Sequence, residues 1–144
     1  MGIWFGNTPT IEEAQATQQG LLGSHLGIRF TEFGDGFLRG TMPVAPHTHQ
    51  PMGYLHGGAS VVLAETLGSV AANYVVDRSR QRCLGQEINA NHLRPVSAGL
   101  VTGTARPFHI GARSHVWSIE IRDPEERLVC VSRLTIAVID WRPK

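Results

Sequence analysis

The stretch Gly57–Val76 reads GGASVVLAETLGSVAANYVV, and its pattern decides the fold of the chain. It lacks proline and carries one charged side chain, Glu65, so it predicts a single long helix over about 57–76, about 30 Å in length. Because this helix is apolar nearly all round, it has to be buried against something of similar length. Glu65, Asn73 and two serines, without a flanking aromatic belt, indicate a buried helix and not a membrane span.

Six strand-like stretches flank this helix, two before it and four after it. They are Ile28–Thr31, Phe37–Met42, Cys83–Leu93, Gly99–Arg106, Ser114–Arg122 and Leu128–Ile139. In the fifth stretch, Trp117, Ile119 and Ile121 alternate with polar residues, which is the period of a half-buried strand. Short turns between the stretches favour antiparallel neighbours. We therefore predict an α+β fold in which an antiparallel β-sheet wraps around one long central helix.

The length and composition describe one ordinary domain. The 144 residues correspond to a single domain over 1–144, large enough to fold without disulfides or a structural metal. Thr10 and Glu13 have capping-box spacing, which predicts a short N-terminal helix over about 10–22. Charged residues make only 17% of the chain, which favours a surface partly covered by subunit contacts. The net charge of +1 gives no general attraction to nucleic acid or to a membrane.

The cysteines and the first residues bear on the cellular compartment. Cys83 and Cys130 lie 47 residues apart without a metal-binding spacing, which favours reduced cysteines over a single disulfide. The first residues, MGIWFGNTPTIEEAQ, lack the basic and apolar segments of a signal peptide. We therefore expect a cytoplasmic protein.

Chemically active residue types concentrate in Gln50–Gly58, QPMGYLHGG, and in the helix that follows. Paired glycines at a helix start let a ligand approach free backbone N–H groups, which suits a phosphate or an oxyanion, although they equally suit close packing. Glu65 lies two turns into the helix, where burial would raise its pKa toward the range of a general base. Ser69 follows at i+4 and could hydrogen-bond to it. The alternative is that Glu65 reaches solvent or a subunit interface.

Other polar residues allow weaker interpretations. Three loop histidines include a plausible ligand pair, but no cysteine or carboxylate completes a recurrent pattern, so we expect no metal at His47, His49 and His56. Five basic side chains near strand ends form either a phosphate-binding patch or solvated turns: His92, Arg94, Arg106, His109 and Arg113. The chain lacks the Gly-x-Ser-x-Gly and phosphate-loop motifs, which argues against serine hydrolases and NTPases.

The stretch Gln50–Ser69, QPMGYLHGGASVVLAETLGS, resembles the motif region of hotdog-fold acyl-CoA thioesterases. It is most similar to the branch with a glutamate on the central helix, the 1,4-dihydroxy-2-naphthoyl-CoA hydrolase and 4-hydroxybenzoyl-CoA thioesterase type. The resemblance rests on the order of a glutamine, His-Gly-Gly, a glutamate eight residues after the first glycine and a serine four residues later. It continues through Leu84–His92 and His109–Trp117 and ends near Ile139.

The resemblance implies a hotdog fold and a role for each matching residue. Glu65 would be the nucleophile or general base, and the Gly57 N–H would polarise the thioester carbonyl. Gln50 and His56 would orient the thioester or the water, Ser69 would help to position water, and these groups would assemble across a dimer interface. The segments matching the substrate and CoA site comprise Gly85, His92, Leu93, Arg94, Pro95, His109, Ile110, Gly111, Ala112, Arg113 and Ser114. Ala112 stands where relatives often have serine, so a hydroxyl contact to CoA is not expected there.

The resemblance therefore implies hydrolysis of acyl-CoA or aryl-CoA thioesters to free acid and CoA. CoA is then part of the substrate, no separate cofactor is expected, and the partner is a second copy in a homodimer or homotetramer. Two alternatives share the fold: a non-catalytic acyl-CoA-binding domain and an enoyl-CoA hydratase. The sequence leaves open the acyl group, the choice between dimer and tetramer, and whether Glu65 attacks directly or activates water.

Overall fold

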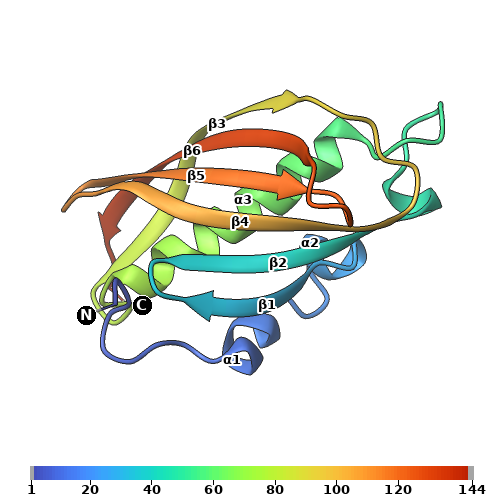
Figure 1. Ribbon diagram of the computed structural model, residues 1–144. Coiled ribbons are helices and arrows are strands. Elements are labelled where there is room, and N and C mark those ends of the chain that lie inside the picture. The colour runs from blue at the N-terminus through green and yellow to red at the C-terminus, as the bar shows by residue number, and fades with distance from the viewer. Residues whose placement is uncertain (1, 143–144) are drawn as a thin grey trace.

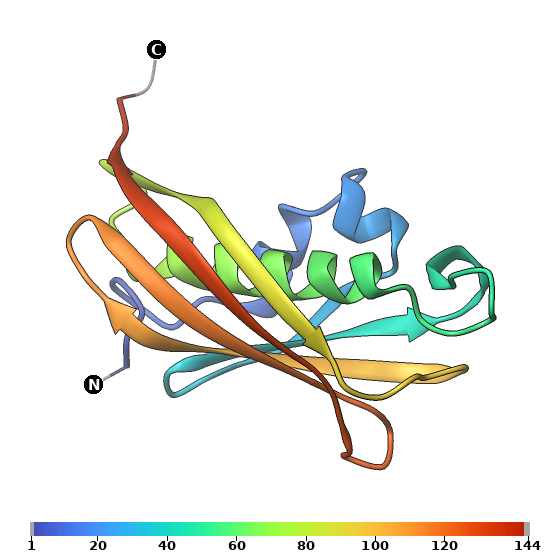
Figure 2. The same ribbon diagram turned by 90° about the horizontal axis from the view of Figure 1, so that it is seen from above.

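A six-stranded antiparallel sheet curves around one long helix, α3 (Gly57–Val75), in the computed structural model (Figure 1, Figure 2). The structure describes residues 2–142, so residues 1 and 143–144 of the expected domain lie outside it. The strands run in the order β1-β2-β4-β5-β6-β3. Their bounds are β1 Arg29–Gly34, β2 Phe37–Val44, β3 Gln81–His92, β4 Gly99–Ile110, β5 Ser114–Arg122 and β6 Leu128–Asp140. This architecture confirms the predicted α+β fold of a sheet wrapped around a central helix.

Glycines let α3 lie close to the sheet. A Cβ on Gly68 of the helix would come within 2.6 Å of Leu134, and one on Gly103 of β4 would come within 2.6 Å of Leu67. The side of α3 that faces the sheet is buried, whereas Glu65 on its flank is only partly buried. Among residues 2–142, no helix has the length and hydropathy that a bilayer crossing requires.

The strands follow the predicted alternation but run further than expected. Trp117, Ile119 and Ile121 of β5 are all fully buried against α3, as their spacing predicted. β4 was expected to end at Arg106, yet it continues through Pro107 to Ile110. The missing N–H of Pro107 is tolerated because the pairing with β2 ends at Ala105 and the ladder with β5 is bulged after Pro107.

The pairing of β3 differs from the expectation that short turns join neighbouring strands. β3 lies at the sheet edge and pairs with β6, so β5 and β6 separate it from β4. Three strand spacings amount to about 14 Å, whereas the six residues 93–98 reach up to about 20 Å. The connection is therefore short in sequence but long enough to pass two strands.

The N-terminal helix is shorter than predicted. The capping box is present, because the Glu13 amide donates to Thr10 Oγ1 at 3.2 Å and the Thr10 amide donates to Glu13 Oε2 at 3.2 Å. However, α1 spans Ile11–Ala16, and a separate short helix, α2, spans Leu22–His25. Gly20 between them has a φ of +73°, a left-handed conformation that interrupts the helix expected over 10–22.

Candidate active site

A loop after β2 carries Gln50 and His56 to the start of α3. It begins with a short 3₁₀ helix, η1 (Pro46–Thr48). The buried Thr48 hydroxyl donates to the carbonyl of Pro43 at 2.8 Å, and the Thr48 carbonyl accepts from the His56 amide at 2.8 Å. The loop is thereby tied back to β2 at one end and to the first turn of α3 at the other.

His56 caps α3 in a way that leaves one backbone donor available. Its Nδ1 accepts a hydrogen bond from the Gly58 amide at 2.8 Å, so the neutral ring carries its proton on Nε2. Its carbonyl accepts from the Ala59 and Ser60 amides. Within residues 2–142 the Gly57 amide has no hydrogen-bond partner. The helix therefore presents a free N–H at its positive end.

A pocket of about 330 Å³ opens beside this free amide. Its lining brings together Gln50, Tyr54, Leu55, Gly57, Ser60, His92, Leu93, Arg94, Pro95 and Val129. A Cβ on Gly57 would lie 2.8 Å from His92 Nε2, so the histidine ring rests against the bare glycine. The Met52 amide donates to Gln50 Oε1, which leaves the side-chain NH₂ of Gln50 as a donor.

A second group of predicted residues lies two turns along α3. Ser69 Oγ donates to Glu65 Oε1 at 3.2 Å. Gly85 of β3 faces the same carboxylate so closely that any Cβ there would overlap Glu65 Oε1. Gly85 was predicted to line the substrate site, and within one chain it lies against the catalytic candidate Glu65. Bare backbone at this point provides the space in which the Glu65 carboxylate sits.

Asn73, which sequence reasoning missed, fixes the distance between α3 and β3. Its Nδ2 donates to the Ser69 and Cys83 carbonyls at 2.9 and 3.0 Å, and its Oδ1 accepts from the Cys83 amide at 2.9 Å. Cys83 lies two residues before Gly85, so the clamp holds β3 beside Glu65. A polar residue at i+4 from Ser69 in an apolar helix was the available signal.

One chain does not bring the two groups of residues together. Gly57 and Glu65 are eight residues apart on one helix, which corresponds to about 12 Å. A single carbonyl cannot accept from the Gly57 amide while contacting Glu65 of the same chain. Nor is Glu65 fully buried in the single chain, so the desolvation that its apolar neighbours suggested is incomplete.

Comparisons with known proteins decide the family. The Thioesterase superfamily matches residues 52–130 of this chain. The chain belongs to the thioesterase superfamily. It is 50% identical to the 1,4-dihydroxy-2-naphthoyl-CoA hydrolase of Escherichia coli, over 90% of this chain and 95% of that protein. It is 51% identical to the proofreading thioesterase EntH of Cronobacter turicensis, over 90% of this chain and 94% of that protein.

Solved structures agree with this assignment. The crystal structure of a mutant thioesterase from Pseudomonas aeruginosa superposes with a TM-score of 0.95 at 47% identity, covering 97% of this chain and all of that one. The predicted resemblance to hotdog thioesterases is thus confirmed, and the protein is a thioester hydrolase. The two alternatives, a non-catalytic binding domain and a hydratase, are not the activities for which these relatives are named.

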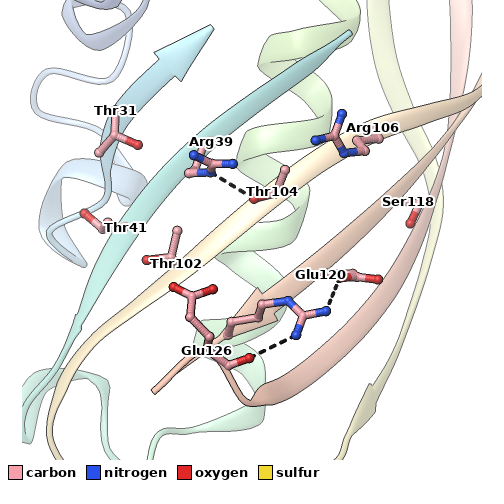
Figure 3. Close-up of a pocket in the computed structure, with 10 residues that line it drawn as sticks. Thr31, Arg39, Thr41, Thr102, Thr104, Arg106, Ser118, Glu120 and Glu126 are labelled. Atoms are coloured by element: carbon pink, nitrogen blue, oxygen red, sulfur yellow. Dashed lines mark hydrogen bonds and ion pairs between the residues drawn. The ribbon is translucent and has the colours of Figure 1, made fainter. Parts of the chain in front are cut away.

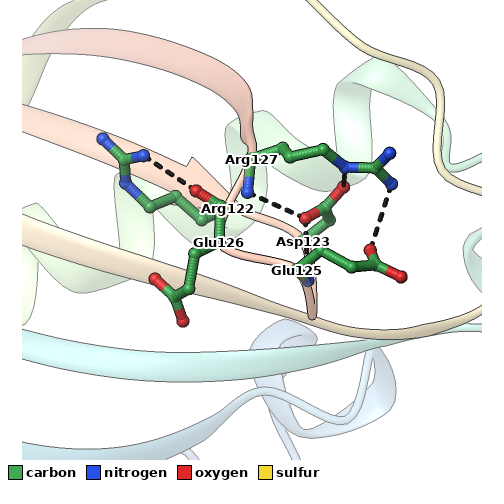
Figure 4. A network of polar contacts seen from close by, with 5 residues as sticks. All are labelled: Arg122, Asp123, Glu125, Glu126 and Arg127. Carbon is green, nitrogen blue, oxygen red and sulfur yellow. Dashed lines mark hydrogen bonds and ion pairs between the residues drawn. The ribbon is translucent and has the colours of Figure 1, made fainter.

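In this thioesterase, hydrogen bonds to β6 fix the His92–Pro95 segment that was predicted to line the substrate site. The Leu93 and Arg94 amides both donate to the Val129 carbonyl, at 2.8 and 3.3 Å. Val129 follows the β5–β6 turn, which is braced by the buried Asp123 carboxylate (Figure 4). This carboxylate accepts from the Arg127 amide at 2.9 Å and from Arg127 Nε at 2.7 Å. Burial alone would raise the pKa of Asp123, but the Arg127 amide and guanidinium outweigh it and hold that pKa below its ordinary value.

The remaining predicted residues of the thioesterase, His109–Ser114, form the β4–β5 hairpin. This hairpin lies at the end of the sheet opposite the start of α3, so one chain does not bring it to the His92–Pro95 segment (Figure 1). His109 and Ile110 belong to β4, and the Gly111 amide donates to the Ser114 carbonyl at 2.9 Å. The exposed Arg113 is tied to β6, because its carbonyl accepts from the Val138 amide at 2.9 Å.

The part of the thioesterase that the structure describes, residues 2–142, contains no group of three His, Cys, Asp or Glu side chains that could hold a metal ion. His49 instead contacts the Ser97 carbonyl through Nε2 at 3.1 Å. Cys83 and Cys130 are both buried and unpaired. Burial raises the pKa of the Cys83 thiol to about 11, which keeps it protonated and unreactive near neutral pH.

Proposed function

We propose that this thioesterase hydrolyses acyl-CoA or aryl-CoA thioesters to free acid and CoA, at two equivalent sites that each lie between two chains. The observation that supports this most is the placement of Glu65. Its carboxylate is held by Ser69 against the bare backbone of Gly85 in the edge strand β3, on a flank of α3 where Glu65 is only partly buried. A carboxylate fixed in this way, with an accessible side, suits attack on a thioester or on water.

The separation of the two groups of residues supports a shared site. β3 is a 12-residue edge strand, and residues 84–87 in its middle are exposed. Long exposed edges tend to pair with another chain. On β3, His92 is the residue that contacts Gly57 of α3, and Gly85 is the residue that contacts Glu65. We propose that the β3 strands of two chains pair antiparallel, with residue 92 of one chain opposite residue 85 of the other. The two-fold axis then lies near Ile88 and Asn89. This pairing brings Gly57 of one chain toward Glu65 of its partner. The expected assembly is a homodimer, or a homotetramer of two such dimers.

The first group of residues binds the thioester carbonyl in this proposal. The free Gly57 amide, at the positive end of α3, donates to the thioester oxygen and stabilises the oxyanion as it forms. Gln50 lines the same pocket as Gly57, whereas His56 caps the helix without lining that pocket, and in the proposal the Gln50 NH₂ and the His56 Nε2–H orient the thioester. Ser69 of the partner subunit keeps the attacking carboxylate in place.

Glu65 acts by one of two routes. In the first, it attacks the carbonyl carbon, the C–S bond breaks, CoA leaves as the thiolate and water then hydrolyses the mixed anhydride. In the second, Glu65 removes a proton from water, which attacks directly. A single turnover in H₂¹⁸O identifies the anhydride route when water attacks the Glu65 carboxyl carbon of the anhydride, because the acid then leaves with an unlabelled Glu65 oxygen and the label stays on the enzyme. Direct attack by water instead labels the acid and leaves Glu65 unlabelled.

Two segments are the candidates for binding the CoA part of the substrate. The His92–Pro95 segment lines the pocket at Gly57, and we expect it to contact the thioester arm. Because the β4–β5 hairpin of the same chain lies at the other end of the sheet, we expect the hairpin of the partner subunit to meet the CoA phosphates. Ala112 has no hydroxyl, so contacts there come from backbone N–H groups and from Arg113. The name of the Escherichia coli relative contains an aromatic acyl group, and we therefore place aryl-CoA first among the candidates.

The test is a panel of aryl, short-chain and long-chain acyl-CoA thioesters, read as kcat/KM from the release of CoA thiol. We expect turnover of CoA thioesters with a preference for aryl groups. The absence of turnover across the whole panel would contradict the proposed CoA substrate class. Turnover with a preference for long chains would retain the reaction and reject the aryl assignment.

A further inference from the structure

The face of the sheet that points away from α3 carries a groove of about 600 Å³ (Figure 3). Strands β1, β2, β4 and β5 line it. Alternation within the strands places it on the outer face, since Leu38, Gly40 and Met42 of β2 are buried against α3 while Arg39 and Thr41 point the other way. The sheet therefore separates this groove from Glu65 and Gly57.

Positive charge gathers at one end of the groove around a single aromatic ring. The guanidinium of Arg106 lies 4.5 Å from the centre of the Phe37 ring, and that of Arg39 lies 4.9 Å from the same centre. Arg39 also pairs with Glu32 at 2.6 Å, whereas Arg106 makes no ion pair within residues 2–142. Both guanidinium groups thus contact the same Phe37 ring, and one carboxylate, that of Glu32, balances the charge of Arg39 alone.

Hydroxyl donors stand beside these two arginines. Thr104 Oγ1 accepts from Arg39 Nε at 3.3 Å, so its own proton remains available to donate into the groove. Ser118 lies directly across the β4–β5 ladder from Arg106, and its other neighbour, on β6, is Arg133. We refer to Arg39, Arg106, Thr104 and Ser118 as the arginine end.

The opposite end of the groove is already neutralised. Arg122 donates to the Glu120 carboxylate at 2.7 Å and to the Glu126 carbonyl at 3.0 Å (Figure 3, Figure 4). Both acidic side chains of the groove, Glu120 and Glu126, lie at this end. Consequently an anion is attracted to the arginine end and repelled from the other.

We propose that the arginine end binds the phosphate or pyrophosphate group of a small phosphorylated ligand. Guanidinium groups and hydroxyl donors match the geometry of phosphate oxygens and form charge-assisted hydrogen bonds with them. The volume of the groove is within the range of small-molecule sites, so the rest of a nucleotide-sized ligand fits along the hydroxyl-lined floor. The proposal does not depend on the catalytic role of Glu65. The phosphate is part of a separate ligand or of CoA itself, and the second source would move the CoA phosphates from the β4–β5 hairpin proposed above to this groove.

Calorimetric titration with pyrophosphate tests the site directly. We expect saturable binding to the wild-type protein and to Glu65→Gln alike, because the sheet lies between the two places. Arg106→Gln is expected to weaken binding by about tenfold or more, which corresponds to about 1.4 kcal/mol. Arg29→Gln removes the same charge from an exposed position outside the groove and is expected to change the affinity by less than about threefold because of screening.

A second titration, with the protein saturated by CoA, distinguishes the two sources of phosphate. If the phosphates of CoA occupy the groove, CoA prevents pyrophosphate binding and Arg106→Gln raises KM for the thioester with kcat unchanged. If the ligand is separate, pyrophosphate binds equally with and without CoA, and KM is unchanged. Absence of saturable binding, or equal binding by Arg106→Gln, would overturn the proposal. A third result would also overturn it: no anion binding by the wild-type protein, together with loss of oligomers in sedimentation of Arg106→Gln. That result would make this face a contact between copies of the chain.

Discussion

Replacing Gly85 by alanine is expected to lower the rate of thioester hydrolysis while leaving the fold intact. The new Cβ would lie well inside 3.0 Å of Glu65 Oε1, whereas ordinary contact begins at 3.4 Å. The carboxylate sits at the end of a flexible side chain, so it retreats by about 1 Å and loses its hydrogen bond from Ser69. A misplacement of about 1 Å at a reacting group can cost about a hundredfold in rate, and we expect a loss of that size in kcat.

The stability of Gly85→Ala is expected to remain at the wild-type level or to rise slightly. The backbone of Gly85 is not in the left-handed region, so alanine fits it without strain. Alanine is also favoured over glycine inside a strand by about 0.5–1 kcal/mol. The variant therefore separates the position of Glu65 from the integrity of the sheet.

The assay measures kcat and KM by release of CoA thiol, alongside thermal melting. Gly2→Ala provides the matched control, because it is the same substitution at a glycine outside the left-handed region, and its added Cβ would make only an ordinary contact, 3.5 Å from Trp4, so both quantities should be unchanged. A Gly85→Ala protein with kcat within about threefold of wild type would refute the reasoning. A loss of activity in step with a lower melting temperature would also refute it, since it would assign Gly85 a structural role.

Three further predictions concern catalysis, assembly and pH. Glu65→Gln is expected to lower kcat by about 10²–10⁴-fold with little change in KM, because the carboxylate acts on the barrier; a folded variant that keeps more than about a tenth of wild-type kcat would contradict this. Mixtures of Glu65→Ala and Gln50→Ala proteins should regain activity through hybrid sites once subunits exchange, and a mixture with confirmed exchange that stays inactive would exclude the shared site. Burial and the charge of His109 lower the pKa of His115 in the folded protein below its ordinary 6.5. As the pH falls, His115 of the unfolded chain therefore binds a proton before His115 of the folded protein does. The free energy of unfolding should consequently decrease as the pH drops below about 6.5. Melting or urea unfolding of His115→Phe from pH 7.5 to 5 should show a weaker pH dependence, by up to about 1.4 kcal/mol per pH unit, and identical slopes for both proteins would contradict the assignment.

Local patterns in the sequence were sufficient for most elements of the fold. The capping box of Thr10 and Glu13, the long helix from Gly57 and the alternation around Trp117 all rest on residues close together in the chain. Such signals depend on backbone periodicity and on nearby hydrogen bonds, which the sequence shows directly. The helix expected over 10–22 was wrong because Gly20 adopts a left-handed φ, a choice that the composition permits but does not require.

The partner of β3 could not be predicted in the same way. Strand pairing joins residues that are distant in sequence, and a six-residue connection can either form a hairpin or pass two strands. Only the assembled sheet shows β3 beside β6 and therefore at an edge. That placement decides which backbone remains free to meet a second chain.

For the proposed site, the sequence by itself was enough to predict the identity and order of the main groups, since Gln50, His56, Gly57, Glu65 and Ser69 lie within one continuous segment. The tertiary structure decided what each group contacts. Gly85 lies against Glu65 because β3 folds back onto α3, and Asn73 sets the distance between them. The rise of an α-helix keeps Gly57 and Glu65 of one chain about 12 Å apart. Side chains and amides on one rigid helix cannot converge on one carbonyl across that distance, and for this reason we propose that a second chain completes the site.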